Sequence, residues 1–189
     1  MAQMSWYNTF KEYFFRRSLS RETAQQERLG EIRNYTNSRY IGIWFDGSNR
    51  ENFTVIDALA RKLASKGKKV EILGYVGKVK KEEKIKFDYI EPHRISWAGV
   101  PDANTQEIWA KIPYDLLLCL HSKPCKPLEY LASLSGAKCR VGRYASDTID
   151  CYDLMVSLQP ENDLPQMIKQ VDQLLTEINK NQQQNVAAI

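Results

Sequence analysis

Residues 40–49 read YIGIWFDGSN, and this stretch decides the fold. The apolar run that opens it is typical of a strand covered on both faces, and the Asp-Gly-Ser-Asn that follows predicts a turn. Ser48 and Glu51 have the spacing of a capping box, so a helix is predicted to begin directly after the turn. Gly67 is predicted to end that helix, because glycine tolerates the left-handed backbone found after many helices.

The rest of the chain continues this alternation of strands and helices. Strands are predicted over residues 69–76 (KVEILGYV), 114–120 (YDLLLCL), 139–142 and 152–158, with 95–97 as a short third strand or an extended segment. Helices are predicted over residues 102–112, with Ile108 and Trp109 facing inward, from Pro127 to Gly136, and over 164–180. This order predicts an α/β fold: a doubly wound, Rossmann-like, mostly parallel sheet of about six strands with helices on both faces.

The length of 189 residues fits one domain with an appendage. We expect an N-terminal helical extension over residues 1–38, the Rossmann-like domain over 39–180 and a polar tail over 181–189. Hydrophobic residues make up 43% of the chain and charged residues 26%, close to globular averages, which excludes a wholly disordered chain. No apolar run approaches the length of about 18 residues that indicates a membrane-spanning helix.

The net charge of +4 is distributed unevenly along the chain. Residues 66–86 carry eight Lys against three Glu, whereas residues 144–189 carry seven acidic residues against two Lys. Clustered lysines attract phosphates, so RNA or ribosome contact is one interpretation of the basic segment, and a solvated face is the other. The candidate basic patch consists of Lys78, Lys80, Lys81, Lys84 and Lys86.

The four cysteines are expected to be reduced thiols, because their density is far below that of a disulfide scaffold. No pair has the C-x-x-C spacing that favours a structural zinc site. The N-terminus lacks the apolar core and cleavage site of a signal peptide, and we expect a cytoplasmic protein. No metal site and no cofactor are predicted.

Polar residues follow two strands that we expect to end at the same edge of the sheet. They are the candidate ligand site: Asp46, Gly47, Ser48 and Asn49 after the first strand, and His121, Ser122 and Lys123 after the strand at 114–120. A helix N-terminus after a strand favours anions, yet the glycine-rich phosphate motifs are missing and Ser48 is also explained as a helix cap. His121 and Cys125 lack a third orienting group, so no catalytic residues are predicted.

The N-terminal segment has an aromatic stripe at helical spacing. The candidate partner-binding residues are Trp6, Phe10, Tyr13 and Phe14, followed by Arg16 and Arg17. Such a helix can pack on its own domain, occupy a partner's groove, or lie on an anionic membrane, in that order of preference. The partner we expect is a protein.

Two segments resemble the acceptor-side half of heptosyltransferases, two-lobed enzymes that use ADP-heptose. These are residues 114–118 (YDLLL) and 128–143 (LEYLASLSGAKCRVGR). The resemblance implies a Rossmann-like half without the donor-binding lobe, for which the chain has no room. The family's Gly-Asp pair is reversed here as Asp46-Gly47, so its catalytic role is not carried over. Two further segments, SWAGVP at 96–101 and YDLMVSL at 152–158, add to the comparison. Together with them, the whole order of strands and helices more closely resembles a small bacterial family of unknown function.

Three functional hypotheses follow. The first is a non-catalytic binding or assembly module that uses the aromatic N-terminal segment. The second is a small enzyme or sensor that binds a nucleotide or sugar phosphate at the switch point of the sheet, and the third is an RNA-associated protein. Convergence of the strand-end side chains on one open pocket would favour the second.

Overall fold

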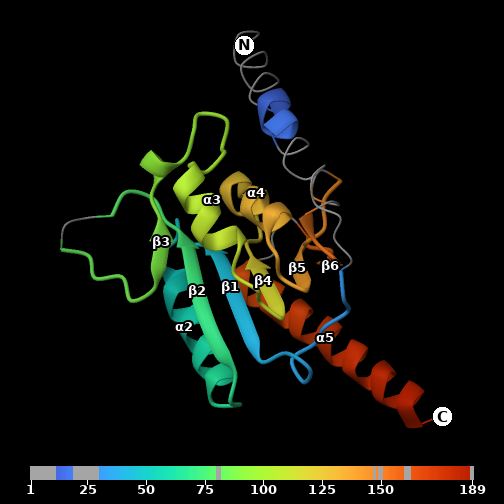
Figure 1. The fold of residues 1–189 in the computed structure, drawn as a ribbon. Coiled ribbons are helices and arrows are strands. Elements are labelled where there is room, and N and C mark those ends of the chain that lie inside the picture. The colour runs from blue at the N-terminus through green and yellow to red at the C-terminus, as the bar shows by residue number, and fades with distance from the viewer. Residues whose placement is uncertain are drawn as a thin grey trace.

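A six-stranded parallel sheet forms the centre of the molecule, in the order β3-β2-β1-β4-β5-β6 (Figure 1). The computed structural model describes residues 12–18, 30–79, 82–146, 148, 151–159 and 163–187. The strands are β1 (Tyr40–Asp46), β2 (Lys69–Tyr75), β3 (Asp88–Ile90), β4 (Leu116–Leu120), β5 (Cys139–Arg143) and β6 (Leu154–Val156). This strand order is that of Rossmann folds, and the predicted fold class is confirmed.

Helices cover both faces of the sheet, as Figure 1 shows. They are α2 (Glu51–Ala64), α3 (Ala103–Ala110), α4 (Lys126–Leu134) and α5 (Leu164–Ala187), with a short 3-10 helix η1 (Pro92–Arg94) and a helical turn over 12–18. Alternate residues of β1 face opposite layers, so that Ile43 packs with α2 and α5 while Trp44 packs with α4. Burial on both faces explains why the strand sequences are apolar throughout rather than alternating.

The third strand lies earlier in the chain than predicted. The ladder partner of β2 is β3 at Asp88–Ile90, and Ile95 forms only an isolated antiparallel bridge with Pro101. Residues between them close a tight turn instead, in which the Ser96 amide donates to the Val100 carbonyl at 2.8 Å. This turn consumes the backbone groups that a strand at 95–97 would need.

The predicted capping box at Ser48 and Glu51 is wrong. The N-cap position of α2 is Arg50, and the amide of Glu51 donates to Oδ1 of Asn49 at 3.1 Å. The Ser48 amide donates to Oδ1 of Asp46 at 2.9 Å, which holds Ser48 in the turn before the helix. Asn49 therefore supplies the side-chain oxygen that we expected from Ser48.

Helix α3 is shorter than predicted and presents a different face. Asp102 caps it by accepting from the Thr105 amide at 2.7 Å. Trp109 packs on the core as predicted, whereas Ile108 is 51% exposed. Adjacent helical residues point about 100° apart, and α3 turns Trp109 rather than Ile108 toward the core.

Helix α5 continues to Ala187, through residues where we expected a polar tail. Its polar end is held by side chains of the 30–38 segment, since Nδ2 of Asn34 donates to Oε1 of Gln182 at 2.8 Å. Within the described residues, no helix combines the length and the apolar character needed to cross a bilayer.

Candidate functional site

A pocket of about 540 Å³ lies where β1 and β4 end side by side. The connections that leave these two strands run to opposite sides of the sheet, so this is the topological switch point at which open α/β folds bind ligands. The lining residues are Asp46, Ser48, Asn49, Asn52, Leu120, His121, Ser122, Lys123, Asp163 and Leu164. The structure thus brings together the two predicted groups of strand-end residues, apart from Gly47, which does not line the pocket.

Hydrogen bonds and close packing fix the β1 side of the pocket. Oδ1 of Asp46 accepts from the Ser48 amide, and Nδ2 of Asn52 donates to the Asp46 carbonyl at 2.9 Å. A Cβ at Gly47 would approach the side chains of Phe53 and Val76 to 2.9 Å, so glycine is required here for packing. The turn is therefore preorganised.

The His121 side chain supports the loop that forms the β4 side of the pocket. Its ring is buried, with Nδ1 2.9 Å from the Lys123 carbonyl and Nε2 2.9 Å from the Tyr152 hydroxyl. Burial lowers the pKa of the imidazole, which is therefore neutral near pH 7. Because a carbonyl only accepts, we assign the proton to Nδ1, which leaves Nε2 to accept from Tyr152.

A buried ion pair supports the same loop. Oε1 of Glu129 accepts from Nη2 of Arg143 at 2.8 Å and from the Cys125 amide at 3.3 Å, and lies 4.0 Å from Nδ1 of His121. Both partners of the pair are more than nine-tenths buried. Removal of one partner would leave an uncompensated buried charge, so the pair fixes the loop after β4 firmly.

The thiols near the pocket are poorly suited to nucleophilic chemistry. None of the four cysteines forms a disulfide, and all four are buried. Burial raises the pKa of the Cys125 thiol well above its usual value. A protonated thiol is a weak nucleophile, and both nitrogens of His121 are already engaged. Among the described residues, no three or more His, Cys, Asp or Glu side chains gather in an arrangement that would hold a metal.

The helical turn over residues 12–18 rests on the domain through Phe15, which the sequence analysis did not select. Phe15 is buried against Tyr130 of α4, with ring centroids 5.8 Å apart. The hydroxyls of Ser18 and Tyr130 are 3.0 Å apart. Of the predicted aromatic stripe, Trp6 and Phe10 lie outside the described residues.

The other residues predicted for partner binding lie on the surface of this turn. Tyr13 is 55% exposed and Phe14 42% exposed, and Phe14 contacts Trp97, itself 52% exposed, with ring centroids 5.3 Å apart. Arg16 pairs with Glu12, and Nη1 of Arg17 donates to the Tyr13 hydroxyl. We call Tyr13, Phe14 and Trp97 the aromatic cluster.

The lysine-rich segment is anchored beside α2. Arg50 forms an ion pair with Glu83, and Phe87 packs on Phe45 and Phe53. Lys78, Lys84 and Lys86 are exposed, while Lys80 and Lys81 lie outside the described residues. RNA contact through these lysines stays a prediction.

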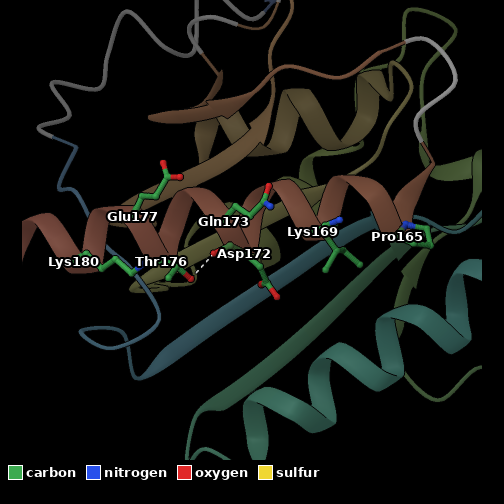
Figure 2. Close-up of a pocket in the computed structure, with 8 residues that line it drawn as sticks. Pro165, Lys169, Asp172, Gln173, Thr176, Glu177 and Lys180 are labelled. Carbon is green, nitrogen blue, oxygen red and sulfur yellow. Dashed lines mark hydrogen bonds between the residues drawn. The ribbon is translucent and has the colours of Figure 1, made fainter.

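A second groove, of about 510 Å³, runs along α5 (Figure 2). Its lining residues come from this one helix: Pro165, Ile168, Lys169, Asp172, Gln173, Thr176, Glu177 and Lys180. The central carboxylate is already engaged, because Asp172 accepts from the Tyr35 hydroxyl at 2.7 Å and from Nζ of Lys62 at 3.0 Å. Both oxygens of this carboxylate are therefore used within the protein.

Residues 11–178 match the sequence model of a protein family that is described as a family of unknown function, DUF6913. The chain belongs to this family. Neither the curated proteins nor the solved structures contain a significant match to it. The DUF6913 match begins before the helical turn over 12–18 and extends into α5, so the turn, the sheet and every pocket residue lie inside the family's domain.

In this DUF6913 protein, sequence reasoning missed several residues of the candidate site. Asn52 and Asp163 line the pocket, and Tyr152 supports His121 from below. Asp163 precedes a predicted helix directly, a position that favours an N-cap carboxylate at the same sheet edge, so a signal for it was present. Tyr152 gave no such signal, because its role depends on the contact between two distant loops.

Proposed function

We propose that this protein binds a small polar molecule of the sugar or nucleotide class at the switch point between β1 and β4. The observation that carries the proposal is the convergence of polar side chains from β1, the loop after β4 and the start of α5 on one pocket. Sites of this kind combine a preformed cavity with a few placed polar groups.

Several of these polar groups are available to a ligand. Within the part of the chain that the structure describes, the hydroxyls of Ser48 and Ser122 and the ammonium of Lys123 make no hydrogen bond to protein. Asp46 uses only Oδ1 in its bond to the Ser48 amide, which leaves Oδ2 to accept. These groups match a ligand that both donates and accepts hydrogen bonds.

The support beneath the pocket favours binding over nucleophilic catalysis. Both ring nitrogens of His121 take part in hydrogen bonds that hold the loop. The nearby Cys125 thiol is buried and protonated. A rigid site loses little conformational entropy on binding, which raises affinity. A binding protein or sensor accounts for these features better than an enzyme of covalent mechanism.

The test is a thermal-shift screen with sugars, nucleosides and their phosphates. A ligand at ten times its Kd should raise the free energy of unfolding by about 1.4 kcal/mol. The double substitution Ser48→Ala with Ser122→Ala should abolish that gain, whereas Ser65→Ala, at the opposite edge of the sheet, should retain it. A gain that is unaffected by the double substitution would place the ligand elsewhere and refute the proposal.

A second candidate function, contact with a protein partner, is favoured by the exposure of the aromatic cluster. Exposed aromatic side chains of this size are enriched in protein interfaces. If the hypothesis holds, Phe14→Ala with Trp97→Ala should remove a stoichiometric partner that co-purifies with the wild-type chain, and Ile32→Ala should retain it. A partner retained by the double substitution would contradict it.

A further inference from the structure

We infer that the pocket takes an uncharged, hydroxyl-rich group, such as the ribose of a nucleoside, and has no phosphate subsite. This inference rests on the proposed function and narrows its ligand class. It departs from what a Rossmann-like sheet suggests, because helix N-termini at this edge commonly bind phosphate.

The first observation concerns the backbone amides at the start of α2. In a phosphate cradle these groups donate to the ligand, but here the protein itself accepts from five of the seven amides over residues 47–53, all except those of Asn49 and Arg50. The amide of Gly47 donates to the Tyr75 carbonyl, and those of Asn52 and Phe53 donate to the carbonyls of Asn49 and Arg50. The amides of Ser48 and Glu51 donate to side-chain oxygens, as described above. A phosphate that used more than the two remaining amides would have to displace these bonds.

At the start of α5, which also lines the pocket, backbone amides likewise donate to acceptors within the protein. Asp163 accepts from the Gln166 amide through Oδ1 and from the Met167 amide through its carbonyl, both at 3.0 Å. Pro165 has no N–H to offer. The second helix N-terminus therefore provides little for an anion to bind.

The charge of the pocket opposes an anion as well. Among the residues that the structure describes, two carboxylates, Asp46 and Asp163, line it against the single ammonium of Lys123. A phosphate dianion in the pocket would be repelled by these two like charges, and this repulsion costs more in a pocket than in open water. Uncharged hydroxyls gain instead, because carboxylates accept strongly from O–H donors.

The remaining polar groups complete a site for neighbouring hydroxyls. Oδ2 of Asp46 only accepts, Nζ of Lys123 only donates, and the Ser48 and Ser122 hydroxyls do both. A vicinal diol can donate to the carboxylate through one oxygen while accepting from serine or lysine through the other. The volume of about 540 Å³ accommodates a sugar ring.

Calorimetric titration of the full chain with adenosine and with adenosine 5′-monophosphate tests this inference. We expect adenosine to bind about tenfold more tightly than the monophosphate. Asp46→Asn should weaken adenosine binding about tenfold by removing a charge-assisted acceptor. It should weaken monophosphate binding less, so that the ratio of the two affinities narrows. Asp57→Asn, on the outer face of α2, is the matched control and should change neither affinity.

The outcomes separate the inference from the proposed function. Equal or tighter binding of the monophosphate, still sensitive to Asp46→Asn, would overturn the inference and leave the pocket as the binding site. Loss of saturable binding of both compounds would overturn both. Inorganic phosphate serves as a third probe, and its binding to the wild-type chain with any dependence on Ser48 or Ser122 would also overturn the inference.

Discussion

At the scale of single residues, the hydrogen bond between His121 and Tyr152 supports the loop on the β4 side of the pocket. Gly142 makes this contact possible, because a Cβ at that position would come within 2.5 Å of the Tyr152 ring. His121 was predicted from its place after a central strand, and it does reach the pocket. Its partner was not predictable, since pattern along the chain shows which strand ends meet but not which loops cross beneath them.

Substitution Tyr152→Phe removes the hydroxyl that donates to Nε2 of His121 and leaves a buried acceptor unpaired. We expect the free energy of unfolding to fall by about 1–3 kcal/mol. In NMR spectra, the amide signals of Ser122 and Lys123 should shift as the loop loses its support. Tyr144→Phe, at an exposed tyrosine, should leave both readouts unchanged. Unaltered stability and loop signals in Tyr152→Phe would show that the bond does not support the loop.

Asp115 gives a pH-dependent prediction at the opposite edge of the sheet. Desolvation raises its pKa, but hydrogen bonds from Lys138 and from the amides of Arg39 and Tyr40 outweigh it and lower the pKa from 3.8 to about 2. The folded state therefore favours the carboxylate. This contribution is complete above the ordinary pKa and disappears as pH falls from about 4 to about 2.

Accordingly, Asp115→Asn should lower the free energy of unfolding by about 2 kcal/mol near neutral pH. The difference from wild type should shrink as pH falls through this window. Chemical denaturation at several pH values measures it, with Asp57→Asn as an exposed control. A difference that stays constant down to pH 2 would mean that the carboxylate charge contributes nothing.

At the scale of elements, the helical turn over residues 12–18 shows what periodicity alone cannot decide. The aromatic spacing predicted a helix here, and the structure has one, but the stripe that we selected includes exposed Tyr13 and Phe14 while Phe15 packs on the domain. Several adjacent aromatic residues allow more than one apolar face, and only the surface that receives the helix selects among them. The same reason explains why Trp109 of α3 packs on the core while its neighbour Ile108 is exposed.

Phe15→Ala tests whether this turn is docked in solution. Loss of the buried ring should weaken the local docking by about 2 kcal/mol or more. Amide hydrogen exchange over residues 12–18 should then accelerate at least about tenfold, while exchange in β1 and β4 stays slow. Phe14→Ala, which truncates a more exposed ring, should have a much smaller effect. Equally fast exchange in wild type and in Phe15→Ala would contradict the docked arrangement.

At the scale of the whole molecule, the alternation of strands and helices in the sequence predicted the class of fold and the edge of the sheet where polar loops gather. It did not predict the order of the outer strands, because short edge strands such as β3 have weak apolar patterns. The topology places β1 beside β4 at the centre, and this placement gathers separated polar residues into one pocket. The function we propose depends on that arrangement and on no single motif.

The most direct test of the central claim is an NMR titration of the isotopically labelled chain with adenosine, followed by mapping of the amide shifts. We predict saturable shifts that concentrate at Asp46, Ser48, Asn49, Ser122, Lys123 and Asp163, with α5 residues Gln173 and Glu177 unaffected as an internal reference. Shifts that concentrate on the α5 groove or the aromatic cluster, or no saturable shifts at millimolar adenosine, would contradict a ligand site at the switch point.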